Sequence, residues 1–278
     1  MNVITHRDFE LVRAVAFEQA AIVLERGKEY LVEARLTPLA LREGFPTLSS
    51  FLSALRCQPS PGLLHSKIAE SLTTNETSFF RDGHPFEALR RSILPELIAK
   101  RRAQRRLTIW SGACSTGQEP FSIAITIREY FPELADWRID ILATDYSPSV
   151  LRHAEDGRYN RIEVSRGLPP GLREKYFVEQ GDEWQIAPEI RSMVEFKQLN
   201  LIGSWPALPS FDLIFLRNVM IYFDVKTKRS ILDRIRPFLR RDGYLFLGSS
   251  ETTLNIAPHW SAVTHDATVV YKLIPTPE

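Results

Sequence analysis

Residues 107–131 read LTIWSGACSTGQEPFSIAITIREYF, a short apolar run followed by small residues and then by a helical pattern. Leu107–Trp110 predicts a buried strand, and apolar residues at helical spacing predict a helix from Pro120 to about Phe131. The loop Ser111–Glu119 joins the two directly. This strand–loop–helix order indicates the first unit of an α/β sheet.

The loop has the features of a ligand-binding turn. Gly112 allows a tight turn off the strand, and Gly117 lets the backbone approach a ligand closely, so we take Gly112 as a candidate cofactor-binding residue. The helix start offers N–H groups without partners, and Pro120 at its first position removes only such a donor. Open α/β sheets bind nucleotides at such crevices. The spacing matches neither GxGxxG nor GxxxxGK[ST], which disfavours a dinucleotide and excludes a P-loop.

The same alternation continues along the chain. Ile139–Ala143, Phe211–Leu216 and Tyr244–Leu247 predict further strands, with a helix over Val225–Arg240 between the last two. Val263–Leu273 predicts a terminal antiparallel pair. Strands that alternate with helices form a mostly parallel sheet covered on both faces, so we expect a doubly wound α/β domain.

Two regions depart from this alternation. Residues 1–75 show short helical patterns without strands, which predicts an N-terminal helical domain with its linker, leaving 76–278 as the α/β domain. Residues 157–199 hold the turn dipeptide Gly181-Asp182 between two short apolar runs. We expect a small antiparallel insertion there, with Val194–Phe196 as a possible third strand.

Composition narrows the function classes. The 278 residues carry a formal net charge of +1, so no overall field favours nucleic acid or an anionic membrane. Cys57 and Cys114 lie far apart and form no metal-ligand pair, so we expect no metal and a reducing, cytoplasmic location. No apolar stretch is long enough to span a bilayer. The basic run Lys100–Arg106, KRRAQRR, is either a solvated helix end or an electrostatic guide for an acidic partner.

Two acidic residues flank the loop. Asp145 ends the second strand, where its carboxylate can accept hydrogen bonds from ribose hydroxyls. Glu119 at the helix start can receive the ammonium of an amino-acid ligand. The plainer alternatives are a helix cap for Asp145 and a favourable helix-dipole interaction for Glu119. A ribose joined to a zwitterionic tail describes S-adenosylmethionine (SAM) better than NAD.

Two further segments carry polar residues of uncertain purpose. Thr73–Asp82, TTNETSFFRD, contains a capping-box pattern in Thr73 and Glu76, which leaves Asn75, Thr77 and Arg81 unexplained. Phe211–Phe223, FDLIFLRNVMIYF, places Arg217 and Asn218 after a strand, with Tyr222 one turn further on.

Together these motifs resemble the CheR family of chemotaxis receptor methyltransferases. The resemblance rests on TNETSFFRD, SGACSTGQEPFS, ILATDYS, RGLP at Arg166–Pro169, FKQLNL and FLRNVMIYF, which occur in this order over nearly the whole chain. It implies a helical N-terminal domain joined to a seven-stranded SAM-binding domain that carries a small β-subdomain.

The resemblance also implies a set of site residues. Those implied to contact SAM are Asn75, Thr77, Arg81, Glu119, Asp145, Asn200, Leu201, Arg217 and Asn218. Arg81 and Tyr222 are implied to lie nearest the transferring methyl group and are the candidate catalytic residues.

The implied reaction moves the methyl group of SAM to glutamate side chains on the cytoplasmic helical bundle of chemoreceptors. The products are a glutamyl methyl ester and S-adenosylhomocysteine. The hairpin around Gly181-Asp182 looks short, which argues against tethering to a receptor's C-terminal pentapeptide. The open alternatives are a SAM-sensing module without turnover and a methyltransferase for another carboxylate. A nucleic-acid amino-methyltransferase is disfavoured, because RNVMIY stands where an NPPY-like motif is needed.

Overall fold

The computed structural model describes residues 4–58 and 62–275. Its contacts divide the chain into two compact units. The helical unit comprises the residues up to Thr74 together with Tyr222–Lys228, and the large unit comprises Asn75–Ile221 and Arg229 onward. Among the described residues, no helix is both long and apolar enough to cross a membrane.

The helical unit is built on short capped helices. They are α1 (His6–Ala20), α2 (Glu29–Arg42), α3 (Leu48–Arg56) and α4 (Leu63–Leu72). Thr47 and Ser50 form a reciprocal capping box at the start of α3, because the first backbone N–H groups of a helix lack internal partners. Fully buried apolar side chains on α1, α2 and α3, such as Phe9, Leu36 and Phe51, form the core.

The large unit contains a seven-stranded, mostly parallel sheet, as the alternation and the family resemblance together predict. Its order is β6-β2-β1-β7-β8-β10-β9, and β10 runs antiparallel to both of its neighbours. The strands are β1 (Arg106–Gly112), β2 (Arg138–Asp145), β6 (Val194–Gln198), β7 (Phe211–Leu216), β8 (Leu239–Leu247), β9 (Trp260–His265) and β10 (Thr268–Leu273). Every residue of β7 is buried, as expected for a parallel strand covered on both faces. The predicted fold class is confirmed.

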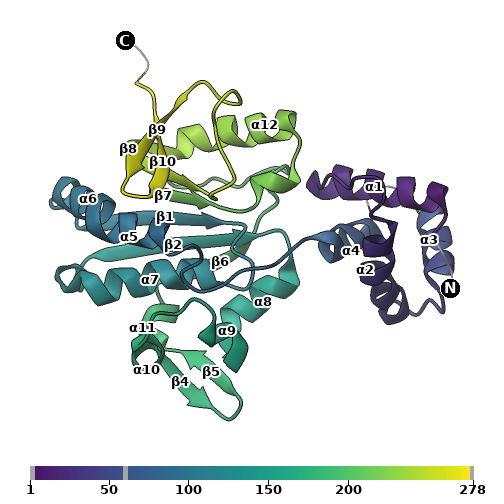
Figure 1. Cartoon of the computed structure of the whole chain (residues 1–278), viewed down its shortest axis with the longest axis horizontal. Helices are drawn as coiled ribbons and strands as arrows, with labels where there is room; N and C mark the ends of the chain where they lie inside the picture. The colour runs from purple at the N-terminus through teal and green to yellow at the C-terminus, as the bar shows by residue number, and fades with distance from the viewer. Residues whose placement is uncertain (1–3, 59–61, 276–278) are drawn as a thin grey trace. The chain divides into compact units, whose positions relative to one another are not determined.

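Helices cover this sheet (Figure 1). They are α5 (His84–Ala88), α6 (Leu94–Arg101), α7 (Gln118–Tyr130), α8 (Pro148–Asp156) and α12 (Val225–Ile235), with a π-helical turn at Leu89–Ile93. Helix α7 contacts β2, β6 and α5. Helix α12 ends five residues before the predicted Arg240, because Pro237 cannot continue the backbone hydrogen-bond ladder and a 3-10 turn follows.

The insertion lies beside the main sheet as a separate three-stranded antiparallel sheet in the order β3-β5-β4 (Figure 1). Its elements are β3 (Arg158–Asn160), α9 (Arg161–Ser165), α10 (Leu172–Tyr176), β4 (Phe177–Gln180), β5 (Glu183–Ile186) and α11 (Pro188–Arg191). Gly181 and Asp182 form the predicted turn, with Gly181 at φ 65°.

The prediction of Val194–Phe196 as the third strand of the insertion is wrong. This segment belongs to β6, the edge of the main sheet, and pairs in parallel with β2, while β3 supplies the third strand of the small sheet. The physical reason is burial: Phe196 packs edge-on against Phe121 of α7, with ring centroids 5.6 Å apart. Apolar alternation alone does not say which of two sheets a strand joins.

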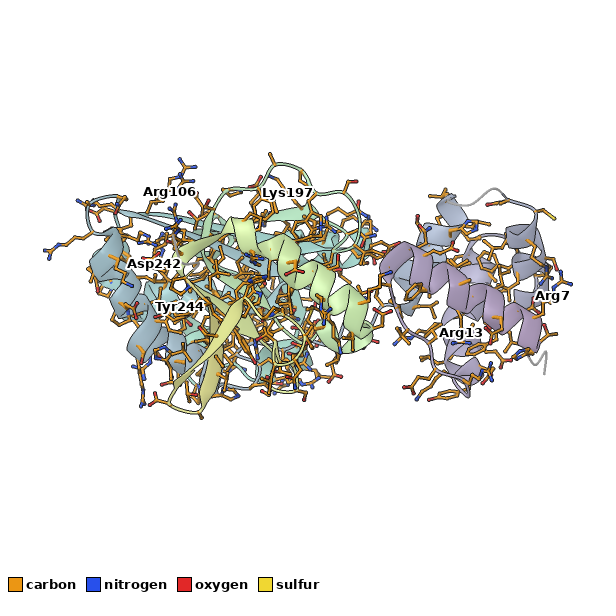
Figure 2. The ribbon with its side chains drawn as sticks, turned by 90° about the horizontal axis from the view of Figure 1, so that it is seen from above. Arg7, Arg13, Arg106, Lys197, Asp242 and Tyr244 are labelled. Atoms are coloured by element: carbon orange, nitrogen blue, oxygen red, sulfur yellow. The ribbon has the colours of Figure 1, made fainter. Side chains whose placement is uncertain are left out.

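The basic run Lys100–Arg106 is paired with acids. Lys100, Arg101, Arg105 and Arg106 contact Glu96, Asp212, Asp136 and Asp140 respectively, and Arg101 also contacts Asp242. Arg106 begins β1, so the run lies at the amino end of the strand, and Figure 2 shows Arg106 and Asp242 toward one end of the large unit. This pairing favours a structural role over an electrostatic guide.

Asp212 is the buried centre of that network and carries a stability prediction. Its side chain is 1% exposed, and it accepts hydrogen bonds from Arg101 Nε at 2.6 Å and from the Thr108 N–H at 2.9 Å. Asp212→Ala leaves both donors unpaired inside the protein, so we expect the free energy of unfolding to fall by about 3 kcal/mol in urea titrations.

The matched control is Asp136→Ala, which removes the exposed partner of Arg105. Exposed ion pairs contribute little, so we expect a change below about 1 kcal/mol. Equal losses in the two variants would contradict a special role for the buried network.

Candidate active site

The loop after β1 has a strained backbone. Ala113 and Ser115 have positive φ values of 57° and 51°, and Gly117 has φ 92° at the N-cap of α7. Gly112 is not among the positive-φ residues, so the prediction that it makes the tight turn is wrong. A Cβ at Gly112 would lie 3.0 Å from Leu216 Cδ1, so a larger residue there would make a tight contact with the side chain of β7.

Hydrogen bonds to two other segments of the chain hold this loop. The Cys114 N–H donates to the Thr144 carbonyl at 3.0 Å, and the Ser115 N–H donates to Asp145 Oδ2 at 2.9 Å. The Ser115 hydroxyl donates to the carbonyl of Asn75 at 2.8 Å. Predicted site residues Asn75 and Asp145 therefore meet at the cofactor loop, defined here as residues 111–119.

Asp145 occupies the carboxyl end of β2, as predicted, and is 7% exposed. Its Oδ1 accepts from the Ser147 N–H at 3.0 Å. The N-cap of α8 is Ser147, whose hydroxyl accepts from the Val150 N–H, so the alternative that Asp145 caps this helix is wrong. The hydrogen bonds that the Asp145 carboxylate accepts from the N–H groups of Ser115 and Ser147 instead fix its direction at the sheet edge.

Glu119 lies in the first turn of α7 and has specific partners. Its Oε1 accepts from the Ser111 hydroxyl at 2.8 Å, and its Oε2 accepts from Arg217 Nη1 at 3.0 Å. Burial raises the pKa of Glu119 above its usual value, although the charge of Arg217 opposes the rise. A helix-dipole interaction alone does not account for these specific hydrogen bonds of Glu119.

Arg217 is the most buried charge of the site, with a side chain 1% exposed. It bridges two carboxylates, since Nη2 donates to Asp82 Oδ2 at 2.7 Å and Nη1 donates to Glu119. Nη2 also donates to the carbonyl of Arg81 at 3.1 Å. Its Nε is buried and has no hydrogen-bond partner among the described residues. A buried donor without a partner is costly, so the carboxylate of an amino-acid ligand suits this position.

Asn218 follows Arg217 in a left-handed conformation, φ 57°, and is held by a residue that the sequence analysis missed. Glu251 Oε2 accepts from the N–H groups of Asn218 at 2.8 Å and Gly248 at 2.6 Å, and Oε1 accepts from Ile221 at 3.2 Å. A Cβ at Gly248 would lie 2.7 Å from Asn218 Nδ2, so no larger residue fits. The available signal was an acidic residue shortly after a strand that is followed directly by glycine.

Asn200 and Leu201 begin the loop after β6. The Leu199 N–H donates to the carbonyl of Asp145 at 2.9 Å, which brings this loop beside the end of β2. Arg234 donates to the carbonyl of Leu201 at 2.9 Å and lies 4.1 Å from the ring of Trp205. The loop is therefore fixed at the carboxyl edge of the sheet, next to Asp145.

Thr73 and Glu76 do not form the capping box that their spacing allowed. Helix α4 ends at Leu72, and the Thr73 hydroxyl donates to the carbonyl of Glu70 at 2.7 Å, so Thr73 closes a helix and starts none. Glu76 instead pairs with Arg166 at 2.6 Å. The capping-box alternative is wrong.

Buried aromatic side chains anchor the end of this segment, as predicted. Phe79 is fully buried, and the Phe80 N–H donates to the Ser122 hydroxyl of α7 at 2.9 Å. Arg81 Nη1 donates to the carbonyl of Glu76 at 2.8 Å. Thr77, in the same segment, is half-buried.

Tyr222 falls in the helical unit, where its carbonyl accepts from the Val23 N–H at 3.1 Å. Its catalytic role stays a prediction. Asp82, Ser111 and Glu251 are the structural partners that the sequence analysis missed.

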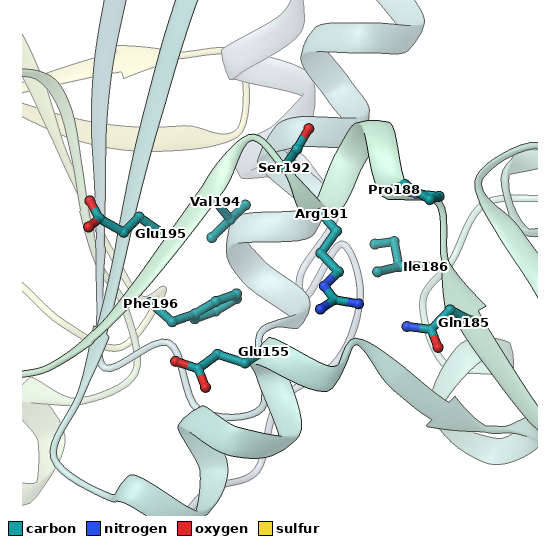
Figure 3. Close-up of a pocket in the computed structure, with 9 residues that line it drawn as sticks. All are labelled: Glu155, Gln185, Ile186, Pro188, Arg191, Ser192, Val194, Glu195 and Phe196. Carbon is teal, nitrogen blue, oxygen red and sulfur yellow. The ribbon is translucent and has the colours of Figure 1, made fainter.

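A separate open groove of about 790 Å³ lies where the insertion meets the sheet edge (Figure 3). It is lined by Glu155, Gln185, Ile186, Pro188, Arg191, Ser192, Val194, Glu195 and Phe196. None of the predicted site residues lines it, so this groove is distinct from the cofactor loop.

Comparison with known proteins identifies the family. Residues 75–269 match the family described as CheR methyltransferase, SAM binding domain, and residues 7–69 match the CheR methyltransferase all-alpha domain. The chain is 42% identical to chemotaxis protein methyltransferase 1 of Pseudomonas aeruginosa over 269 residues, covering 95% of this chain and 97% of that protein. It is 38% identical to chemotaxis protein methyltransferase Cher2 of Pseudomonas putida, with 95% and 97% covered. A chemotaxis protein methyltransferase of Vibrio parahaemolyticus is 37% identical, with 92% of each chain covered. The chain therefore belongs to the CheR family of SAM-dependent methyltransferases.

Proposed function

We propose that this enzyme methylates glutamate side chains on the cytoplasmic helical bundle of chemotaxis receptors, forming a glutamyl methyl ester and S-adenosylhomocysteine. The observation that carries the proposal is the buried Arg217, held between Asp82 and Glu119 with its Nε unpartnered among the described residues. This arrangement suits a zwitterionic amino-acid ligand. The names of the relatives, chemotaxis protein methyltransferases, support a role in chemotaxis.

The cofactor contacts follow from the charges of the site. In this proposal, Arg217 Nε binds the carboxylate of the SAM amino-acid group and Glu119 binds its ammonium. The unpartnered Nε, among the described residues, supports the first contact. Asp145 at the end of β2 binds the ribose hydroxyls, and Asn200 and Leu201 lie beside the adenine. Asn75, Thr77, Arg81, Gly112 and Asn218 complete the proposed set of cofactor-binding residues.

The chemistry needs no general base. A glutamate carboxylate is already ionised near neutral pH, and bound SAM supplies an electrophilic methyl carbon on a sulfonium. The carboxylate oxygen forms the new C–O bond as the C–S bond breaks, and the bonding electron pair stays on sulfur, so no proton moves. Alignment of such reactants is worth roughly 7–11 kcal/mol. Arg81 steers the carboxylate, and Tyr222 fixes its orientation.

Receptor labelling tests the proposal directly. Membranes rich in chemoreceptors are incubated with the enzyme and tritiated SAM, and we expect base-labile label on the receptor. Base-stable label, or label only on a small molecule, would contradict glutamate esterification of receptors. Asp145→Asn is the control, because it should abolish labelling through lost cofactor binding.

The same assay decides how the receptor is held. Strands β4 and β5 are joined by only the two-residue turn Gly181-Asp182, which supports direct recognition of the methylated helices. A receptor that lacks its last five residues should therefore be labelled at an unchanged rate.

Arg81→Ala tests the catalytic assignment. The contact of Arg81 with Arg217 uses the backbone carbonyl, so the substitution keeps that contact and removes the exposed hydrogen bond from Nη1 to the Glu76 carbonyl. Loss of the side chain that positions the acceptor should lower turnover by about 10²-fold in the tritium-transfer assay. Arg91→Ala, which removes an exposed arginine paired with Glu87, should leave turnover unchanged. Near-normal turnover of Arg81→Ala would reject the assignment.

Glu119 predicts a pH dependence of ligand binding. Burial raises the pKa of Glu119 in the free enzyme, and a bound ammonium should lower it. Binding then releases a proton, and the affinity for S-adenosylhomocysteine should fall as the pH drops through the raised pKa, approaching tenfold per pH unit. Calorimetry over pH 5–8, in roughly half-unit steps, measures this slope. Glu119→Gln should bind more weakly and lose the slope; an unchanged slope would exclude Glu119.

A further inference from the structure

We infer that Tyr159, the central residue of β3, is a positioning residue that holds the cofactor loop in its binding conformation. The Tyr159 hydroxyl donates to the carbonyl of Thr116 at 2.7 Å. Thr116 belongs to the cofactor loop, whereas Tyr159 belongs to the insertion. The small sheet therefore contacts the cofactor loop through the Tyr159 side chain.

The loop needs such a support because its backbone is strained. Ala113 and Ser115 carry side chains yet have positive φ values, which are unfavourable and persist only where surrounding contacts impose them. Asp145 and Asn75 hold the loop at Ser115, and Tyr159 holds the following residue, Thr116. Two successive residues are thus fixed by different parts of the chain.

Tyr159 is itself rigidly placed. It is fully buried, and its ring packs edge-on against Phe79 and Phe121, with centroids 5.0 Å and 6.4 Å apart. A Cβ at Gly117 would lie 3.1 Å from the Tyr159 hydroxyl, so the loop and the ring pack closely. Burial also raises the pKa of Tyr159, which keeps its hydroxyl protonated and able to donate.

Phe79 ties a third segment to the same ring. A Cβ at Gly167 would lie 2.0 Å from the Phe79 carbonyl, so the RGLP run of the insertion lies directly against Phe79. The insertion thus touches the cofactor loop and the segment that leads to Arg81. These contacts connect the insertion to the cofactor site.

Tyr159→Phe isolates the hydroxyl, because it keeps the ring and its packing. We expect the Kd for S-adenosylhomocysteine to rise about fivefold, as for the loss of one hydrogen bond. The KM for SAM should rise similarly while kcat at saturating SAM stays within about twofold, because the lost contact affects ground state and transition state alike.

Tyr176→Phe is the matched control. Tyr176 is also buried in the insertion, and its hydroxyl donates to Glu129 of α7 at 2.7 Å, away from the cofactor loop. Its Kd for S-adenosylhomocysteine should match that of the unchanged enzyme. Equal rises in both variants would indicate general loosening of the insertion and overturn the inference, as would an unchanged Kd in Tyr159→Phe.

Amide hydrogen exchange without ligand provides a second readout. The amides of residues 113–117 should exchange faster in Tyr159→Phe than in Tyr176→Phe, and equal exchange would overturn the inference. This role of Tyr159 concerns cofactor binding and does not depend on glutamate being the methyl acceptor. If receptors were not labelled but Tyr159→Phe still raised the Kd and sped up amide exchange, only the proposed function would be contradicted.

Discussion

The site depends on one buried cation. Arg217 joins three segments that are far apart in sequence, through Asp82, Glu119 and the Arg81 carbonyl. A guanidinium with 1% exposure is tolerated only if most of its donors are paired, so these segments must converge whenever the large unit folds. The fixed fork of arginine sets the directions of approach, which lysine could not do. The end of β7, the start of α7 and the turn at Asp82 therefore form one rigid frame.

The charges of this frame select the ligand. Two carboxylates face one guanidinium, and Glu251 adds a third negative charge nearby that further raises the pKa of Glu119. The net negative charge favours a cationic group, whereas the unpartnered Nε of Arg217 favours an anionic one. A zwitterionic amino acid linked to a sulfonium satisfies both demands at once. A dinucleotide, with its doubly charged pyrophosphate, does not.

Periodicity was sufficient to predict the main strands because parallel strands buried on both faces are nearly continuous apolar runs, as in β7. Periodicity was not sufficient where close side-chain contacts, or competition between two sheets for one strand, determine the structure. Gly112 lies close to the Leu216 side chain of β7, and β6 pairs with β2 because Phe196 packs on α7. Asn200 and Leu201 came only from the family resemblance, since nothing in their own pattern marks them. Asp82 and Glu251 act by accepting hydrogen bonds from distant residues, which no local pattern reveals.

The same guanidinium links cofactor binding to alignment of the acceptor. Arg217 binds the Arg81 carbonyl and the neighbouring Asp82 carboxylate, in a turn where Phe80 and Asp82 both have positive φ. Such a turn persists only while its contacts hold it, so a shift of Arg217 would also displace Arg81. A reaction without proton transfer depends on alignment for its rate. The residues that bind the amino-acid end of SAM thereby also set the position of the side chain proposed to steer the incoming carboxylate.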